Sequence, residues 1–278
     1  MTPPLPRLAE ANDVDDVLRN VDKVIRWSIA QESHLGYFAA IYQRVTLAIR
    51  DAINNEKFKD GHRVARLDVA FAQRYFNALN AYFHPKQCQG LTLPWEVAFV
   101  GDHDGQAVIL QHMMSAFTAH ISFDLGMACF AIAPDSLKTL EPDFIRVNAL
   151  LCSQMPDMVA KMQELSPELR WMRRLLPDEL GVFDRVLTNM REGAWLFANS
   201  MAENAANAPQ KRVHQAAWTA ALASWYLHPP EKFTPFPALV RAIAKQESPN
   251  VADNIKLLQQ VSNTPDKLHQ RYLKPLRK

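Results

Sequence analysis

Hydrophobic residues recur at intervals of three and four along most of this chain, which is the spacing of amphipathic helices. Val14, Val17, Val21 and Ile25 follow this spacing in a first predicted helix, residues 12–29. The same period predicts further helices over 35–53, 61–83, 106–133, 142–165, 182–203, 212–227, 236–245 and 251–261, with a short helix from Pro167 and a short apolar segment at 94–99. The alternation typical of strands is scarce. The pattern predicts a single all-α domain of about ten helices, residues 1–278.

Residues 106–133 are the most apolar of these segments and form the predicted central helix. They contain a single formally charged side chain, Asp124, with His112 and His120 ahead of it. A buried charge without a partner costs several kcal/mol or shifts its pKa until it is neutral. We therefore expect these side chains to be hydrogen-bonded, ion-paired or bound to a metal. The segment is long enough to cross a membrane, but its polar residues favour a buried helix of a globular protein, so no membrane span is expected.

Composition excludes several classes of function. The net charge of +2 argues against nucleic-acid binding, which relies on a clustered basic surface. The three cysteines contain no CxxC spacing, and the N-terminus lacks an apolar export signal, so a cytoplasmic protein without disulfides is expected. Neither GxGxxG nor GxxxxGK[ST] occurs, so no nucleotide cofactor is predicted.

The central helix offers candidate metal ligands. On an α-helix, His120 and Asp124 lie one turn apart, about 6 Å in rise, and can share one ligand. An imidazole and a carboxylate at this spacing suit a divalent metal such as zinc, iron or manganese. Asp68 falls on the apolar stripe of the helix 61–83 and is a candidate third ligand. His112 lies about 12 Å from His120 along the axis, so it is assigned as a general acid or base.

Other polar residues on apolar stripes complete the candidate site. Arg74 can pair with a carboxylate from another helix or hold an anionic group of a substrate, and Arg191 repeats that pattern in the helix 182–203. Glu32 and His34 precede the helix 35–53 at its capping region. Glu32 and His214 are kept as reserve ligands, although an interaction with the helix N-terminus explains Glu32 and a core position explains His214. Structural hydrogen bonds and salt bridges remain an alternative explanation for all of these residues.

Three stretches resemble the DUF5995 family, helical bacterial proteins of unassigned function. These are HLGYFAAIYQRVTLAIRDAI (34–53), RLDVAFAQRYFNAL (66–79) and LQHMMSAFTAHISFDLGMA (110–128). The resemblance covers about residues 15–200, and the helices of 205–278 are expected to pack on that region. It implies that the polar candidates belong to recurring blocks but supplies no reaction; the residues in these blocks are Tyr42, Asp68, Arg74, Tyr75, His112, His120 and Asp124.

These observations favour an enzyme, and three functions fit them. The first is a metal-dependent hydrolase for a small, partly apolar substrate that can carry an anionic group. Its metal ligands would be His120 and Asp124, its catalytic residues His112, Asp68 and Tyr42, and its substrate-binding residues Arg74, Arg191 and Tyr75. The second is a metal-free isomerase, cyclase or lyase that uses a His–Asp dyad for proton transfer. The third is a non-catalytic helical module that binds a ligand or a partner. The sequence leaves the oligomeric state open.

Overall fold

The computed structural model describes residues 3–134, 137–167, 179–230, 232 and 236–260, and throughout these ranges the regular structure is helical. The predicted all-α fold of about ten helices is thus confirmed. The principal elements are α1 (Val14–Ala30), α2 (Leu35–Asn54), α3 (Gly61–Phe83), α4 (Leu93–Val100), α5 (Ile109–Phe117), the π-helix η1 (Thr118–Leu125), α6 (Gly126–Ile132), α7 (Leu137–Leu165), α9 (Glu179–Glu203), α10 (Ala208–Leu227), α11 (Phe236–Ala244) and α12 (Val251–Gln259). Most of the short helix predicted from Pro167 lies outside the described residues.

Polar caps and prolines set most of the helix ends. The side chain of Asp13 accepts a hydrogen bond from the amide of Asp16 at the start of α1, and Asp60 does the same at the start of α3. α3 ends at Phe83, two residues before a proline. The prediction that Pro142 opens a helix was wrong, because α7 begins at Leu137 and continues through the proline. Buried side chains in the first turn of α7 anchor it there.

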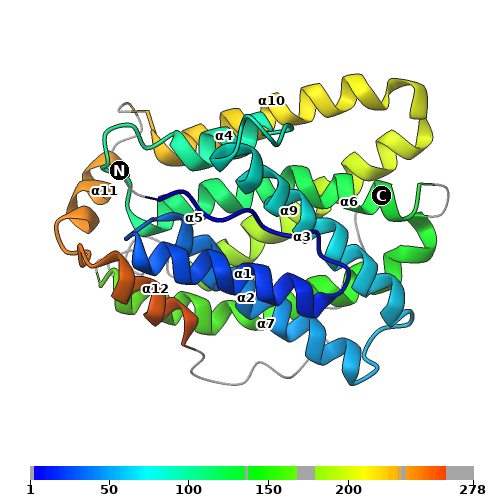
Figure 1. The fold of residues 1–278 in the computed structure, drawn as a ribbon, viewed down its shortest axis with the longest axis horizontal. Helices are drawn as coiled ribbons and strands as arrows, with labels where there is room; N and C mark the ends of the chain where they lie inside the picture. The colour runs from blue at the N-terminus through cyan, green and yellow to red at the C-terminus, as the bar shows by residue number, and fades with distance from the viewer. Residues whose placement is uncertain (1–2, 135–136, 168–178, 231, 233–235, 261–278) are drawn as a thin grey trace.

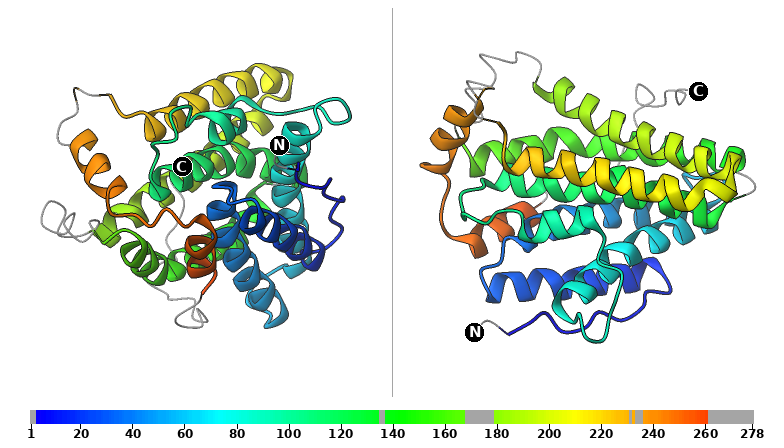
Figure 2. Two further views of the ribbon diagram at one scale, coloured as in Figure 1. Left: turned by 60° about the vertical axis from the view of Figure 1, so that its left-hand side comes forward. Right: turned by 90° about the horizontal axis from the view of Figure 1, so that it is seen from above.

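α5, η1 and α6 follow one another without a break and form the central helix of the molecule. α4 and α10 pack along one side of it, while α2, α3 and α9 contact it elsewhere (Figures 1 and 2). Among the described residues, this helix (Ile109–Ile132) is the one long and apolar enough to cross a membrane, and more than half of its most apolar window is buried inside the molecule. A buried core helix passes the same test, so the finding is weak evidence for a membrane span.

Close packing of α9 against the central helix depends on Gly126, the first residue of α6. A Cβ atom built at this position would lie 2.6 Å from Cδ1 of Phe197 and 2.7 Å from the carbonyl oxygen of Ala194, both in α9. Contacts this short do not occur between a real Cβ and a backbone atom. The absence of a side chain therefore lets the α9 backbone approach the central helix at this point.

A turn and a loop from opposite sides of the central helix come together at one end of the molecule. The turn joins α1 to α2, and these two helices pack with α12 and α7 below the central helix in Figure 1. The loop joins α4 to α5 on the side of α10. These two connections bring side chains from α1, α2, α3, α4 and α5 into the wall of one cavity.

Candidate functional site

The core contains an ionised pair built around Asp124 of η1, whose two carboxylate oxygens both accept hydrogen bonds. Nε of Arg74 in α3 donates to Oδ1 at 2.7 Å, and Nε1 of Trp95 in α4 donates to Oδ2, also at 2.7 Å. Nδ1 of His120 lies 3.4 Å from Oδ2. The Asp124 side chain is 1% exposed, so these partners supply what water would otherwise provide.

The His120 imidazole is enclosed by aromatic rings. It stacks on Phe71 with the ring centroids 3.6 Å apart, and the Tyr42 ring meets it edge-on at 4.9 Å. Burial lowers the pKa of His120 and outweighs the opposite effect of the neighbouring Asp124. The ring is therefore neutral at pH 7.

Three buried polar atoms in this region have no hydrogen-bond partner within the described part of the chain. They are Nε2 of His120, the hydroxyl of Tyr42 and Oδ2 of Asp68. Burial raises the pKa of Asp68 to about 7. Burial also raises the pKa of Tyr42, and the Asp68 carboxylate adds to that effect. Each unpartnered buried atom costs about 1–3 kcal/mol unless water or a ligand satisfies it.

Polar side chains from α2, α3, α4 and η1 thus meet in the core. The prediction that Asp68, His120 and Asp124 are buried is confirmed, as is the pairing of Arg74 with a carboxylate from another helix. Their roles as catalytic residues or metal ligands stay predictions. The predicted spacing of His120 and Asp124 was worked out for an α-helix, whereas both residues lie in η1, which is a π-helix with a wider turn. Such turns often occur at functional sites.

Arg191 lies apart from this cluster. Its Nη2 is 3.0 Å from Sγ of Cys152 in α7 and 3.3 Å from Oγ1 of Thr188 in α9. The side chain is buried, as expected, but its hydrogen bonds connect α7 to α9. The structure therefore does not place Arg191 beside Asp68 or Asp124.

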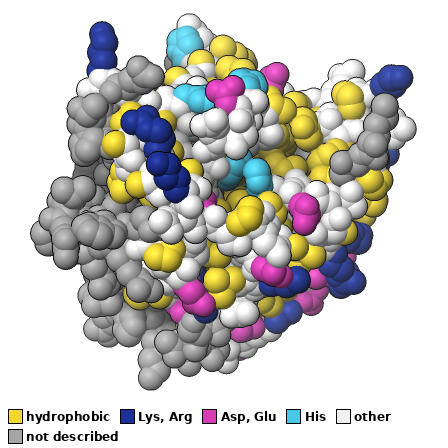
Figure 3. All heavy atoms as spheres, turned by 90° about the vertical axis from the view of Figure 1, so that its left-hand side faces the viewer, with side chains coloured by type: hydrophobic (Ala, Val, Ile, Leu, Met, Phe, Trp, Pro, Cys, Tyr) yellow, Lys and Arg dark blue, Asp and Glu magenta, His cyan; other side chains and the backbone are white. Residues whose placement is uncertain are grey.

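A cavity of about 400 Å³ lies in front of the buried cluster. Histidine and hydrophobic side chains lie close together around a recess on the face shown in Figure 3. The wall of the cavity is mainly aromatic; its rings come from Trp27, Phe38, Tyr75, Tyr82, Phe83, Trp95 and Phe99. A concave, mostly apolar space with a few converging polar groups is the usual form of a small-molecule site.

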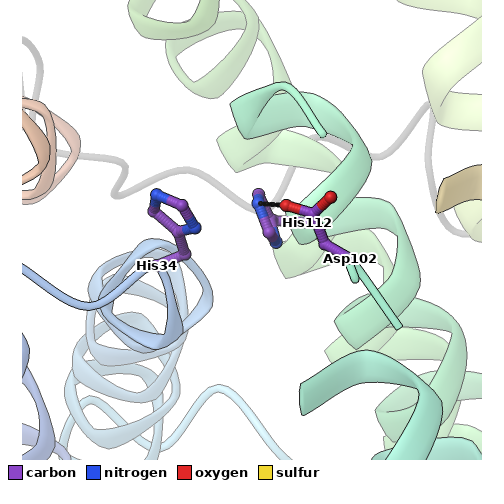
Figure 4. Close-up of side chains that lie close together, drawn as sticks. All are labelled: His34, Asp102 and His112. Atoms are coloured by element: carbon purple, nitrogen blue, oxygen red, sulfur yellow. Dashed lines mark ion pairs between the residues drawn. The ribbon is translucent and has the colours of Figure 1, made fainter. Parts of the chain in front are cut away.

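Those converging polar groups are His34, Asp102 and His112 (Figure 4). His34 is the N-cap residue of α2, Asp102 belongs to the loop after α4, and His112 lies in the first turns of α5. Nε2 of His112 is 3.4 Å from Oδ2 of Asp102, and the rings of His34 and His112 are 4.5 Å apart between centroids. One ligand atom from each residue can be chosen so that all three lie within 4.8 Å of one another.

Local structure fixes the orientation of Asp102. Its Oδ1 accepts hydrogen bonds from the amides of Gln106 and Ala107 at 2.9 and 3.1 Å, which leaves Oδ2 toward His112. The loop turns back at Gly105, where φ is +62°, in the left-handed region that glycine adopts without strain. The carboxylate is therefore held by the backbone of the segment that leads into α5.

The two imidazoles are suited to bind a cation. Burial lowers the pKa of His112 to about 4, with a further lowering by His34 and an opposing effect of Asp102. Burial also lowers the pKa of His34. Neutral imidazoles are the form that coordinates a metal. Nε2 of His112 is buried and has no hydrogen-bond partner among the described residues.

The spacing also fits a metal after a small adjustment. Ligand atoms around a tetrahedral zinc ion are about 3.3 Å apart, given metal–ligand bonds of about 2.0–2.1 Å. The pair His112–Asp102, at 3.4 Å, already has that separation. His34 is the exposed member and needs a shift of roughly 1.5 Å at most, which a side-chain rotation provides.

Sequence reasoning found part of this site. Of the predicted residues, Tyr75 and His112 line the cavity, whereas Tyr42, Asp68, Arg74, Arg191, His120 and Asp124 are not among its lining residues. His34 was noted only at the capping region of α2, and Asp102 and Trp95 were missed. Of the reserve ligands, Glu32 lines the cavity and His214 does not. Asp102 lies in a turn before α5, where an acid is ordinary, so its place in the sequence did not mark it as a ligand.

Comparison with known proteins identifies a family and no function. Residues 14–229 match the model of a family described as "Family of unknown function (DUF5995)". The match extends beyond the region of about 15–200 over which the sequence resemblance was noted, and it includes α10. No curated protein and no solved structure matches the chain.

Proposed function

Since the chain belongs to the DUF5995 family, whose function is unknown, we propose its activity from the site alone: a metal-dependent hydrolase for a small, partly apolar substrate. The observation that carries the proposal is a His–His–Asp triad in the wall of an aromatic cavity. Two imidazoles and one carboxylate suit zinc, iron or manganese and leave coordination positions open. A divalent ion at such a site supplies Lewis acidity toward water and toward a carbonyl or phosphoryl oxygen.

We place the metal at His34, Asp102 and His112 rather than at His120 and Asp124. Both oxygens of Asp124 already accept hydrogen bonds from Arg74 and Trp95, so a metal there would have to displace a donor. In the triad, by contrast, Oδ2 of Asp102 and Nε2 of His112 make no hydrogen bond to each other and sit at a coordination spacing.

The remaining residues of the cavity position the substrate. The aromatic rings bind an apolar group and exclude water from it, while the triad lies in the same wall and faces the reacting end. Trp95 belongs to this wall and donates to the buried Asp124, so the Arg74–Asp124 pair fixes the indole. The buried cluster thus supports the cavity from behind.

A second function, metal-free acid–base catalysis, is favoured by one observation. Nε2 of His120, the hydroxyl of Tyr42 and Oδ2 of Asp68 are buried without partners, and burial brings the pKa of Asp68 to about 7. A substrate that reached these atoms would meet groups able to give or accept a proton at neutral pH. It would have to pass the rings of Phe38, Tyr75 and Trp95 at the cavity wall.

Metal binding by chelator-treated protein tests the first proposal. We expect isothermal titration with zinc or manganese to give one ion per chain in the wild type and a loss of that binding in His112→Gln. His103→Gln is the matched control, because His103 is an exposed histidine beside Asp102 that does not belong to the triad. Wild-type protein that binds no ion, or a His112→Gln variant that binds as well as the wild type, would overturn the assignment. Loss in His120→Gln with retention in His112→Gln would move the metal to the buried cluster.

Turnover is tested on a panel of 4-nitrophenyl carboxylate and phosphate esters with the metal-loaded protein. We expect hydrolysis that a chelator abolishes and that added metal restores, with His112→Gln inactive and His103→Gln unchanged. Turnover that is insensitive to chelation but lost in His120→Gln would favour the acid–base alternative.

A further inference from the structure

The cavity has a further polar side chain beside the triad, where α1 ends. Trp27 from the last turns of α1 packs edge-on against Phe83, with the centroids 4.9 Å apart, and Tyr82 meets Phe83 at the same distance. Glu32, in the turn after α1, lines the same cavity as these rings. An acidic side chain and a group of aromatic rings thus share one cavity wall.

The formal charge of the cavity wall is negative. Among the described residues that line it, Glu32 and Asp102 are the formally charged side chains, and neither lysine nor arginine occurs. Oδ1 of Asp102 accepts hydrogen bonds from two backbone amides and its Oδ2 faces His112, so Glu32 is the carboxylate at the α1 end of the cavity. The C-terminal end of α1 adds a partial negative charge at the same place, because the dipole of a helix points its negative end there.

The backbone at Glu32 has a φ of +50°, the left-handed conformation that commonly ends a helix, and Glu56 has the same conformation after α2 with a φ of +52°. This turn reverses the chain after α1 and leaves the Glu32 carboxylate in the wall of the cavity.

From these observations we propose that the α1 end of the cavity binds the ammonium group of a ligand whose body is apolar. Aromatic faces and a carboxylate together attract a cation through the ring quadrupole and through direct charge. This names a substrate class for the proposed hydrolase, and it rests on the cavity rather than on the metal. Arg74 and Arg191, which we expected to hold an anionic group, do not line the cavity.

Three ligands of similar size that differ in charge test the proposal. Isothermal titration of chelator-treated protein would compare 2-phenylethylammonium, 2-phenylethanol and phenylacetate, which carry a positive charge, no charge and a negative charge. We expect the ammonium to bind about tenfold more tightly than the alcohol, a difference of about 1.4 kcal/mol, because the ring faces and the Glu32 carboxylate both attract a cation. Phenylacetate should bind most weakly.

Two variants locate the effect. Glu32→Gln is expected to remove most of the difference between the ammonium and the alcohol, and because Glu32 is exposed the variant should fold normally. Glu96→Gln is the matched control: Glu96 is an exposed acid of α4 that does not line the cavity, so the preference should persist. Equal affinity for the ammonium and the alcohol, no binding of any ligand, or an unchanged preference in Glu32→Gln would each overturn the proposal.

The test also separates this inference from the proposed hydrolase. His112→Gln should lose zinc and keep the preference for the ammonium, because neither Glu32 nor the aromatic rings belong to the triad. Ammonium binding without zinc binding would leave the inference standing and remove the hydrolase. Zinc-dependent turnover without a preference for the ammonium would support the hydrolase and overturn the inference about the ammonium.

Discussion

Replacing Asp68 by asparagine should change how the stability of the protein depends on pH. Asp68 is 4% exposed, its Oδ2 has no hydrogen-bond partner among the described residues, and burial raises its pKa from 3.8 to about 7. Asparagine has nearly the same shape and no charge to desolvate. The substitution therefore isolates the cost of ionising this carboxylate inside the core.

The sign and size of the effect follow from the two pKa values. Between pH 4 and 7 the folded protein holds the Asp68 proton and the unfolded chain has released it. The stabilisation that protonated Asp68 provides is fully present below the unfolded pKa and is lost as the pH rises to the folded one. At 1.36 kcal/mol per pKa unit, the wild type loses about 4 kcal/mol over this range relative to Asp68→Asn.

Urea unfolding of both proteins at pH 5 and pH 8 measures this difference. From pH 5 to pH 8 the free energy of unfolding of the wild type should decrease by about 3 kcal/mol relative to that of Asp68→Asn. Asp51→Asn, at an exposed position of α2, is the control and should show almost none of it. A wild type and an Asp68→Asn variant whose stabilities run parallel from pH 5 to 8 would refute the reasoning, since Asp68 would then be ionised in the fold without cost.

Two other substitutions test the packing of the core by urea unfolding. Gly126→Ala should lower the free energy of unfolding by about 1–3 kcal/mol, because its Cβ meets the α9 backbone, whereas Gly193→Ala, with open space around it in α9, should raise it by up to about 1 kcal/mol. Equal effects of the two changes would contradict the close approach at Gly126. Trp95→Phe should cost about 1.5–3 kcal/mol, the value of a hydrogen bond to a charged group, and Trp27→Phe should cost less, since its indole bonds to a carbonyl in an exposed segment. A Trp95→Phe protein as stable as the wild type would show that the bond to Asp124 contributes nothing.

The helices were predictable because each one buries a stripe of apolar side chains. α3 was predicted with its observed bounds, Gly61–Phe83, since a long stripe, an Asp cap and a following proline all agree. The start of α7 was misplaced because proline at the first turn is only a preference, and buried leucines on the preceding turn extended the helix. The π-helix η1 could not be predicted, because a shift from i+4 to i+5 hydrogen bonding leaves the apolar pattern almost unchanged.

The buried cluster was partly predictable for a different reason. An aspartate and a histidine in an apolar helix require partners, and this reasoning located His120 and Asp124 and suggested Arg74 as a partner. It could not say which polar residues share a cluster, since that depends on how helices cross; Arg191 pairs with α7 instead. Asp102 and Trp95 carry no such signal, because an acid in a turn and an aromatic residue in a short helix are ordinary.

The cavity and the buried cluster around Asp124 form one arrangement, and Trp95 is the residue that connects them. One part of its side chain lines the cavity, and its Nε1 donates to Asp124 behind it. Asp124 can accept that bond in the core because Arg74 neutralises it, and η1 presents it there. Asp124 stood out in the sequence because it is a charged residue in an apolar helix. In the structure its buried charge holds the indole ring of Trp95 in place. The proposed metal triad has a different origin: its side chains come from a helix cap, a loop and a helix face that meet in the cavity wall. Because the three residues come from separate segments and from ordinary positions, the sequence alone does not show that they meet.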